Sequence, residues 1–232
     1  KLELIESYIE EFFKDKSILK GLNAVVTSGP SIEKIDPVRF LSNFSSGLQG
    51  YEIAKALSNA GAKTTLISGP TKLEKPSNVT FKSVKSGEEF LDTSLNSLPT
   101  DIFVSVAAIS DWKIKNYNLN KLKKTTKQPK LIFEKNVDTL QTISCSNQRP
   151  KLVIGFSADT QNLINNAKKK LKKKKCDWIV ANDVSNEKGF NRNNNKVFIL
   201  KKENIIEWPL LTKKNIAKKL VKEIHEHLKI IL

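Results

Sequence analysis

The sequence predicts an α/β fold with a doubly wound, mostly parallel sheet. Short apolar runs of strand type alternate with segments whose apolar residues recur at helical spacing, as in successive β-α-β units. The most apolar run, IFVSVAA at 102–108, suits a central parallel strand that is buried on both faces. We therefore expect a Rossmann-like domain, to which the rest of the chain adds a protruding arm and a C-terminal hairpin.

The N-terminal half contains the clearest alternation of strands and helices. A long polar loop follows the first strand and leads into a helix that begins near Leu48 and ends before Gly61. In a second helix, Phe90, Leu91 and Leu95 should face inward because they share one helical face. The expected elements are strand 24–27, helix 48–60, strand 63–68, strand 79–84, helix 87–98 and strand 102–108.

The C-terminal half begins less regularly. Residues 112–130 are polar, rich in Lys and Asn and without a clean period, so they form either a mobile loop or an arm that reaches outside the domain. Two strand-like runs at 196–200 and 205–208 flank a polar turn and predict a hairpin. The other expected elements are strand 131–133, helix 138–144, strand 152–156, helix 162–175, strand 177–181 and helix 213–228.

The 232 residues predict one domain preceded by a linker. Apolar residues between Leu2 and Phe13 recur at helical spacing with acids between them, which predicts a linker helix within residues 1–20. Residues 21–232 show no internal repeat and no second core pattern, so we assign them to one domain. The chain contains no methionine, even at position 1, and we expect it to be part of a longer protein.

Composition argues against several classes of protein. No apolar run is long enough to cross a bilayer and no signal-peptide pattern opens the chain, so we expect a cytoplasmic protein without a membrane partner. Cys145 and Cys176 lie far apart without a partner motif, which argues against disulfides and zinc. The net charge of +16 comes from lysines spread over many segments. We expect no nucleic-acid partner, although a basic nucleic-acid module stays an alternative.

Chemistry is expected at the loop between the first strand and the first helix. A helix N-terminus attracts anions, and the preceding loop, SNFSSG at 42–47, lets a ligand approach the backbone closely. A dinucleotide-binding oxidoreductase would need a G-x-G-x-x-G turn and an acid after the second strand. Only G-x-x-G at 47–50 is present and the second strand ends in SGP, so this class is disfavoured.

Several short motifs resemble, in the same order, those of the phosphopantothenoylcysteine synthetase family. Each motif alone has an ordinary structural explanation, such as a turn with a salt bridge, a helix cap, a core residue or a solvated run of lysines. Together they cover nearly the whole chain from Gly21 to the last helix. The motifs are DPVR at 36–39, SN at 42–43, SSG at 45–47 with GY at 50–51, AAISDW at 107–112, KLKK at 121–124, NVDTL at 136–140, GFSADT at 155–160 and ANDVS at 181–185.

The resemblance implies a ligase of coenzyme A biosynthesis. Its substrates would be 4′-phosphopantothenate, L-cysteine and CTP, joined through an acyl-cytidylate intermediate, with Mg²⁺ on the triphosphate. The resemblance also implies a homodimer or higher homo-oligomer, and a preceding decarboxylase half that alone would use FMN. The sequence leaves open whether the nucleotide is CTP or ATP. A catalytically inactive, nucleotide-binding regulatory protein of the same fold is the alternative.

The resemblance also assigns roles to individual residues. Lys121 would stabilise charge on the α-phosphate, and Asn43 would assist the attack of cysteine on the acyl carbonyl. Ser45, Ser46 and Gly47 would form the substrate-binding loop, and the metal ligands are left unassigned. The expected nucleotide contacts are Ser105, Val106, Ala107, Asp111, Lys121, Val137, Asp138, Thr139, Leu140, Phe156, Lys170 and Lys174.

Overall fold

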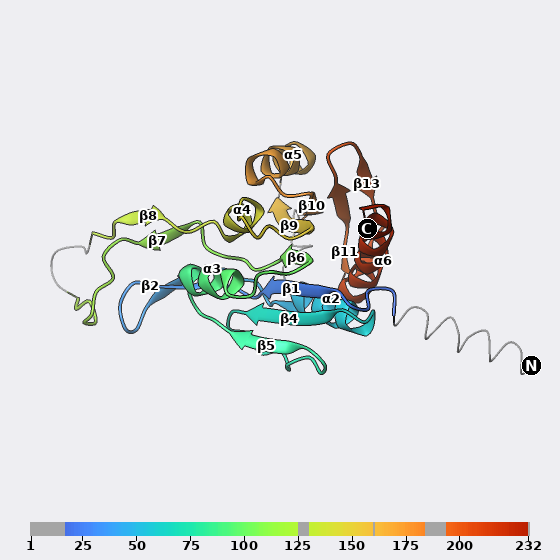
Figure 1. Cartoon of the computed structure of the whole chain (residues 1–232). Helices are drawn as coiled ribbons and strands as arrows, with labels where there is room; N and C mark the ends of the chain where they lie inside the picture. The colour runs from blue at the N-terminus through green and yellow to red at the C-terminus, as the bar shows by residue number, and fades with distance from the viewer. Residues whose placement is uncertain (1–16, 125–129, 160, 184–193, 232) are drawn as a thin grey trace, which may run out of the picture.

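An eight-stranded sheet forms the centre of the computed structural model, which describes residues 17–124, 130–159, 161–183 and 194–231 (Figure 1). Its strands are β1 (Asn23–Ser28), β4 (Lys63–Ser68), β5 (Thr80–Ser83), β6 (Ile102–Ser105), β9 (Leu152–Asp159), β10 (Trp178–Asp183), β12 (Val197–Leu200) and β13 (Ile205–Glu207). The order is β13-β12-β10-β9-β6-β1-β4-β5. The strands from β10 to β5 are parallel, whereas β12 and β13 are antiparallel. The predicted doubly wound, mostly parallel sheet is confirmed.

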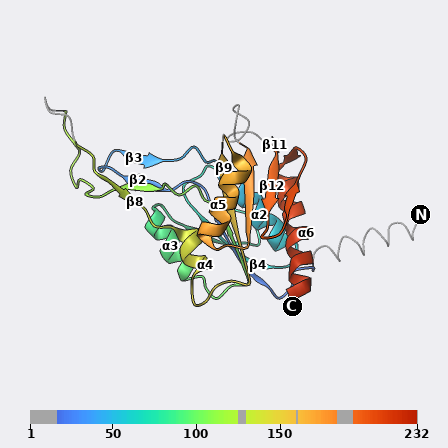
Figure 2. The ribbon, with the colours of Figure 1, turned by 90° about the horizontal axis from the view of Figure 1, so that it is seen from above.

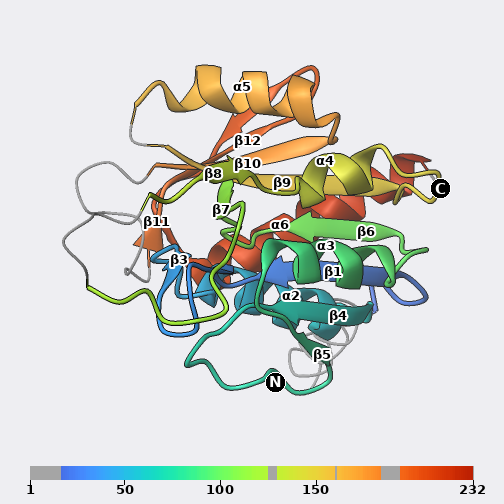
Figure 3. The ribbon, with the colours of Figure 1, turned by 90° about the vertical axis from the view of Figure 1, so that its left-hand side faces the viewer.

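Helices cover both faces of this sheet (Figure 3). One face packs against α2 (Leu48–Asn59) and α6 (Lys213–Ile231), and the other against α3 (Gly87–Leu95), α4 (Thr139–Ser144) and α5 (Leu163–Lys174). Successive strand residues alternate between the two cores, so Val104 packs on the α2 side and Phe103 on the α5 side. The central strand β6 is therefore buried on both faces, although it ends at Ser105, earlier than its apolar run predicted.

Glycines determine where α2 begins and how closely it packs on the sheet. Gly47, at the N-cap of α2, has a φ of 79°, a conformation that glycine adopts without strain. Gly50 lies directly against β1, since a Cβ placed on it would stand 2.4 Å from the Ser28 hydroxyl oxygen. That hydroxyl donates a hydrogen bond to the Gly47 carbonyl (2.7 Å). The first turn of α2 is thus held beside the carboxyl end of β1.

Two hairpins project from the carboxyl edge of the sheet (Figures 1 and 2). The first hairpin, β2 (Ile32–Lys34) with β3 (Phe40–Ser42), interrupts the segment that was predicted as one long loop. That prediction was wrong because strands of three residues carry too little alternation to be recognised. The second, β7 (Trp112–Ile114) with β8 (Phe133–Lys135), forms the base of the predicted arm, residues 112–124 and 130–135. The strand predicted at 131–133 begins two residues later.

The C-terminal region contains the predicted hairpin and a small addition to it. β12 and β13 pair antiparallel, and β11 (Asn194–Asn195) pairs with β14 (Leu211–Thr212) just before α6. In α3, by contrast, Leu95 is exposed and Ser94 is buried, opposite to the prediction for Leu95. Ser94 is accommodated because its hydroxyl donates to the Phe90 carbonyl within the helix (2.7 Å).

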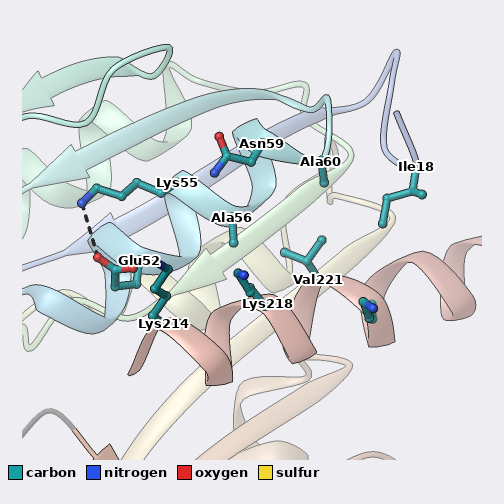
Figure 4. A pocket seen from close by; sticks show the side chains of 10 residues that line it. Ile18, Glu52, Lys55, Ala56, Asn59, Ala60, Lys214, Lys218 and Val221 are labelled. Carbon is teal, nitrogen blue, oxygen red and sulfur yellow. Dashed lines mark hydrogen bonds and ion pairs between the residues drawn. The ribbon is translucent and has the colours of Figure 1, made fainter. Parts of the chain in front are cut away.

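The chain enters the domain through a turn at residues 17–21. Leu19 is buried there, and its N–H donates to the Ala60 carbonyl (2.8 Å). The helix predicted between Leu2 and Phe13 lies outside the described residues. Beside the turn, a hollow of about 710 Å³ between α2 and α6 is lined mainly by lysine and small side chains (Figure 4). None of the helices in the described ranges combines the length and apolarity that a bilayer crossing requires.

Candidate functional site

Two adjoining cavities lie at the carboxyl edge of the parallel strands. The α5 cavity, of about 410 Å³, is bounded by the end of β6, the start of α4 and one face of α5. The α2 cavity, of about 400 Å³, is bounded by the first turn of α2, the ends of β9 and β10 and the start of α6. The residues that line both are Ala107, Ile109, Asp111, Phe156 and Lys170. The two cavities meet beside β1 and β6, where the winding of the sheet reverses and ligands of such folds bind.

Lysines from α5 supply positive charge to the α5 cavity. Lys170 and Lys174 lie four residues apart on one helical face, and both line the cavity together with Lys173. Burial and the nearby Lys174 lower the pKa of Lys170, while Asp111 and Asp138 oppose that shift. The Lys170 ammonium donates to the Phe156 carbonyl (2.8 Å), and Lys174 pairs with Asp138. A polyphosphate bound in this cavity would therefore contact two half-buried cations, Lys170 and Lys174.

The start of α4 forms the opposite wall of the α5 cavity. Asp138 caps this helix, since its carboxylate accepts a hydrogen bond from the Gln141 N–H (3.0 Å). Thr139 is buried, and its hydroxyl has no hydrogen-bond partner among the described residues. Such a group costs free energy unless a ligand or water satisfies it. With apolar walls from Val137 and Leu140, the cavity can hold a nucleotide whose phosphates lie on the lysines.

The loop at 43–47 lines one side of the α2 cavity. The side-chain amide of Asn43 donates to the Ala108 carbonyl (2.8 Å), which holds Asn43 close to the boundary between the cavities. The Ser45 hydroxyl accepts from the Gly47 N–H (3.3 Å) and thereby shapes the entry into α2. Because residues 47–50 line the cavity, the positive N-terminal end of α2 is available to an anion.

The α2 cavity also contains a concentration of unsatisfied polar groups. Lys213 is 6% exposed, and its ammonium has no hydrogen bond or ion pair within the described part of the chain. Burial lowers the pKa of Lys213. Within the described ranges, side-chain oxygens without a partner belong to Gln49, Ser157, Asn182 and Asn195. Buried polar groups are rarely left unpaired in folded proteins, so this cavity is a strong candidate for a ligand site.

The structure brings most of the predicted site residues to these two cavities. Asn43, Ser45, Ser46, Gly47 and Val106 line the α2 cavity. Lining the α5 cavity are Ser105, Ala107, Asp111, Val137, Asp138, Thr139, Leu140, Phe156, Lys170 and Lys174. The backbone N–H groups of Val106 and Ala107 already bond to the Thr27 hydroxyl (3.2 and 3.3 Å). A nucleotide contact by either residue would therefore use other atoms.

Lys121 is the predicted site residue that lines neither cavity. It is exposed on the arm, next to a contact that ties the arm to the first hairpin. There, Asp36 accepts from the Leu122 N–H (3.1 Å), and Arg39 donates to the Leu122 carbonyl (2.8 Å). Asp36 is buried, and the Arg39 guanidinium holds the pKa of its carboxyl well below the usual range. The DPVR motif thus contains the structural salt bridge that its local alternative predicted, and both side chains of that salt bridge also hydrogen-bond to Leu122 of the arm.

The sequence analysis did not identify several residues that line the α2 cavity or position other site residues. Lys213 and Gln49 line the α2 cavity, but one lysine among many and one glutamine in a helix carry no local signal. Glu33 is buried and accepts hydrogen bonds from the Gly87 N–H (3.0 Å) and the Asn136 side-chain amide (2.8 Å). Glu33 therefore positions the NVDTL motif, although it lies in a segment that was predicted to be a loop.

The sequence of this chain matches one family model and several curated proteins. The profile of the DNA/pantothenate metabolism flavoprotein C-terminal domain matches residues 19–228. The chain belongs to this family. The coenzyme A biosynthesis bifunctional protein CoaBC of Haemophilus influenzae is 38% identical over 225 residues, which cover 97% of this chain and 56% of that protein. The CoaBC protein of Escherichia coli K12 is 34% identical over 218 residues, which cover 91% and 53%.

Solved structures related to the family share its fold. The crystal structure of the C-terminal domain of a CoaBC protein is 37% identical, with a TM-score of 0.78 over 92% of this chain and 98% of that one. A DNA/pantothenate metabolism flavoprotein from Streptococcus pneumoniae is 22% identical, with a TM-score of 0.77 over 89% of this chain and 100% of that one. The family resemblance predicted from the motifs is confirmed. This chain spans about half the length of the curated CoaBC relatives it matches.

Proposed function

We propose that this chain is a ligase that joins 4′-phosphopantothenate to L-cysteine at the expense of CTP, in the cytoplasmic synthesis of coenzyme A. The observation that carries the proposal is the meeting of two cavities at Asp111 and Lys170. One cavity suits a nucleotide, and the other contains the predicted substrate loop. The names of the CoaBC relatives support the pathway. A Cab2 variant of similar fold (TM-score 0.72, 16% identical) was solved with phosphopantothenate-cysteine.

In the first step the substrate carboxylate is activated. A carboxylate oxygen bonds to the α-phosphorus of CTP, the bond from that phosphorus to the pyrophosphate oxygen breaks, and pyrophosphate leaves. Lys170 and Lys174 hold the triphosphate, because charge-assisted hydrogen bonds to phosphate are strong. Lys121 stabilises the charge that develops on the α-phosphate. The product is a mixed anhydride of the acyl group and CMP.

In the second step the amine nitrogen of cysteine attacks the acyl carbon. The bond from that carbon to the CMP oxygen breaks, the amine loses a proton and CMP leaves. One N–H of the Asn43 amide is used by the Ala108 carbonyl, and the second can donate to the acyl oxygen. This bond would strengthen as negative charge builds on that oxygen. The mechanism needs no protein nucleophile.

The residues at the boundary fit a Mg²⁺ ion bound to the triphosphate. Mg²⁺ usually keeps several waters and takes one or two carboxylates together with phosphate oxygens. Asp111 is exposed and lines both cavities, so its carboxylate would hold the ion beside the phosphates. Within the described ranges, no cluster of three His, Cys, Asp or Glu side chains could hold a metal ion. A bound Mg²⁺ would supply charge neutralisation on the triphosphate.

The arm supports a homodimer in which each subunit completes the site of the other. Large apolar side chains are exposed on it and on the first hairpin, which marks an interaction surface. They are Val38, Phe40, Trp112, Leu119, Leu131, Ile132 and Phe133. Since Lys121 lies outside the cavities of its own chain, we propose that it enters the site of the partner subunit. In the full-length protein, a preceding decarboxylase half would carry FMN.

Pyrophosphate release in the presence of phosphopantothenate and Mg²⁺ tests the proposed function. CTP and ATP are compared, with and without cysteine, in the wild type and in Asn43→Ala. We expect CTP-selective release that turns over with cysteine, and accumulation of acyl cytidylate in the variant because its second step is slower by about 100-fold. Asn59→Ala, which alters an exposed side chain of α2 outside both cavities, should behave like the wild type. Folded protein that binds CTP without releasing pyrophosphate would support the regulatory alternative instead.

A further inference from the structure

Lys213 is buried in the α2 cavity without a counter-charge. It is 6% exposed, and no carboxylate among the described residues pairs with its ammonium. Lys213 is also the first residue of α6, where the helix dipole disfavours a positive charge. The side chain is largely buried, while its ammonium is not fully enclosed and has access to the cavity, so an anion bound there would stabilise the charge. The location of this lysine therefore indicates an anionic ligand.

The groups around Lys213 can contribute to an anion site. The Gln49 side-chain amide donates to the Lys213 carbonyl (3.2 Å), which connects the first turn of α2 to the first residue of α6. The N-terminal turn of α2 and Lys213 thus line the same cavity. Asn195 is 4% exposed, and its side-chain oxygen has no partner among the residues that the structure describes. A half-turn of its amide would present N–H donors to the same space.

The position of Lys213 within the site indicates which anion it binds. The carboxylate that reacts with CTP must reach the boundary between the cavities, where Asp111 and Lys170 lie. Lys213 and Asn195 line the α2 cavity and do not line the α5 cavity. 4′-Phosphopantothenate carries its carboxylate and its phosphate at opposite ends. When the carboxylate lies at the boundary and the nucleotide occupies the α5 cavity, the phosphate end extends into the α2 cavity, which Lys213 lines.

We propose that Lys213 binds the phosphate group of the acyl substrate, together with the N-terminus of α2. The inference rests on the proposed function and deepens it, because it assigns the residue that distinguishes 4′-phosphopantothenate from pantothenate. Lys213 does not touch the reacting atoms, so it acts in substrate binding and selection. Its removal should raise KM for the phosphorylated substrate and leave kcat nearly unchanged.

Calorimetric titration with 4′-phosphopantothenate and with pantothenate tests this inference. The wild type should bind the phosphorylated compound at least about tenfold more tightly. Lys213→Met should lose about 10- to 100-fold in affinity for 4′-phosphopantothenate, while its affinity for pantothenate stays within about twofold. In steady-state assays KM for 4′-phosphopantothenate should rise by a similar factor, with kcat changed by less than about threefold.

Two controls separate this role from a structural one. Lys214→Met removes the next lysine, which is exposed and lines the hollow between α2 and α6 (Figure 4), and should change neither affinity. The thermal midpoint of Lys213→Met should equal or exceed that of the wild type, because the variant removes a charge that has no partner among the described residues and sits at a helix N-terminus. Lys213→Gln, which keeps a polar group, provides a second variant and should lose the phosphate preference equally.

The outcomes that contradict the inference are distinct from those that contradict the proposed function. Wild-type protein that prefers 4′-phosphopantothenate, with both Lys213 variants keeping that preference in full, would overturn the inference alone. Equal losses of affinity for both compounds would also overturn it. Wild-type protein that binds CTP, binds neither compound and releases no pyrophosphate would overturn the proposed function and the inference together.

Discussion

Lys170 lines both cavities, and its charge state should therefore control nucleotide binding. Lys170→Met should raise the Kd for CTP by about 10- to 100-fold, because a charge-assisted hydrogen bond to phosphate is lost. Lys169→Met, an exposed lysine of the same helix outside both cavities, should leave the Kd unchanged. Fluorescence titration with CTP measures both values. A normal Kd in Lys170→Met would exclude Lys170 from the nucleotide site.

The lowered pKa of Lys170 also predicts the pH dependence of binding and stability. The protonated form binds phosphate, so CTP affinity should fall as pH rises through the folded-state pKa, which lies below 10.5. Between that pKa and 10.5, the unfolded chain binds more protons than the folded protein, so this residue makes stability rise with pH. CTP titrations and urea unfolding across this window should show both trends in the wild type and their loss in Lys170→Met.

At the scale of elements, the position of α2 depends on its close contact with β1. Gly50→Ala would place a Cβ 2.4 Å from the Ser28 hydroxyl oxygen and 2.5 Å from its Cβ, so helix and strand must separate. We expect the free energy of unfolding to fall by about 1–3 kcal/mol, measured by urea denaturation. Lys55→Ala, on the exposed side of α2, should change it by less than about 0.5 kcal/mol. An unchanged free energy of unfolding in Gly50→Ala would show that α2 and β1 can accommodate the added Cβ and are not tightly packed at this position.

A buried carboxylate, that of Asp36, is one of the contacts that hold the arm. Asp36→Ala removes the acceptor of the Leu122 N–H, so amides at 112–124 should exchange hydrogen about tenfold faster, while those of β9 stay unchanged. The pKa of Asp36 is lowered from 3.8, so its contribution to stability is present above 3.8 and is lost as pH falls through the lowered value. Hydrogen exchange near neutral pH tests the contact. Exchange at wild-type rates would show that other contacts hold the arm.

At the scale of the whole molecule, the proposed exchange of Lys121 between subunits predicts complementation. Lys121→Ala and Asn43→Ala should each be nearly inactive, but a mixture allowed to exchange subunits should recover about a quarter of wild-type activity. Half of the dimers would then be mixed, and each mixed dimer would have one intact site. Pyrophosphate release measures the recovery. If Lys121 acted within its own chain, every mixed dimer would lack an intact site and no activity would return.

The dimer itself can be tested at the arm. Phe133→Glu places a charge among the exposed apolar side chains at 131–133, so it should yield monomers and lose most activity. Sedimentation velocity measures the mass, and Ile230→Glu, which alters an exposed apolar residue at the end of α6, serves as the matched control. A monomeric wild type with full activity would contradict the exchange of Lys121.

The sequence by itself determined the succession of the main strands and helices along the chain, the doubly wound, mostly parallel sheet, and most of the predicted site residues that the fold places at the two cavities. These features follow from local causes. Apolar periodicity reports which faces are buried, and motifs such as NVDTL and GFSADT occur where parallel strands end or helices begin. Because such ends meet at one edge of the sheet, the predicted contacts from Ser105 to Lys174 could be expected to gather there.

Only the tertiary structure decided the roles of residues that act through contacts between distant segments of the chain. Gln49 and Lys213 are separated by 164 residues, and nothing local distinguishes this lysine from the others. The contact of Asp36 with the arm could not be predicted from the sequence either, because its partner Leu122 lies 86 residues away. Lys121 has a recognisable motif, yet only the fold shows that it lies outside the cavities of its own chain. Periodicity records which face of an element is buried, whereas the pairing of charges depends on which segments the folded chain brings together.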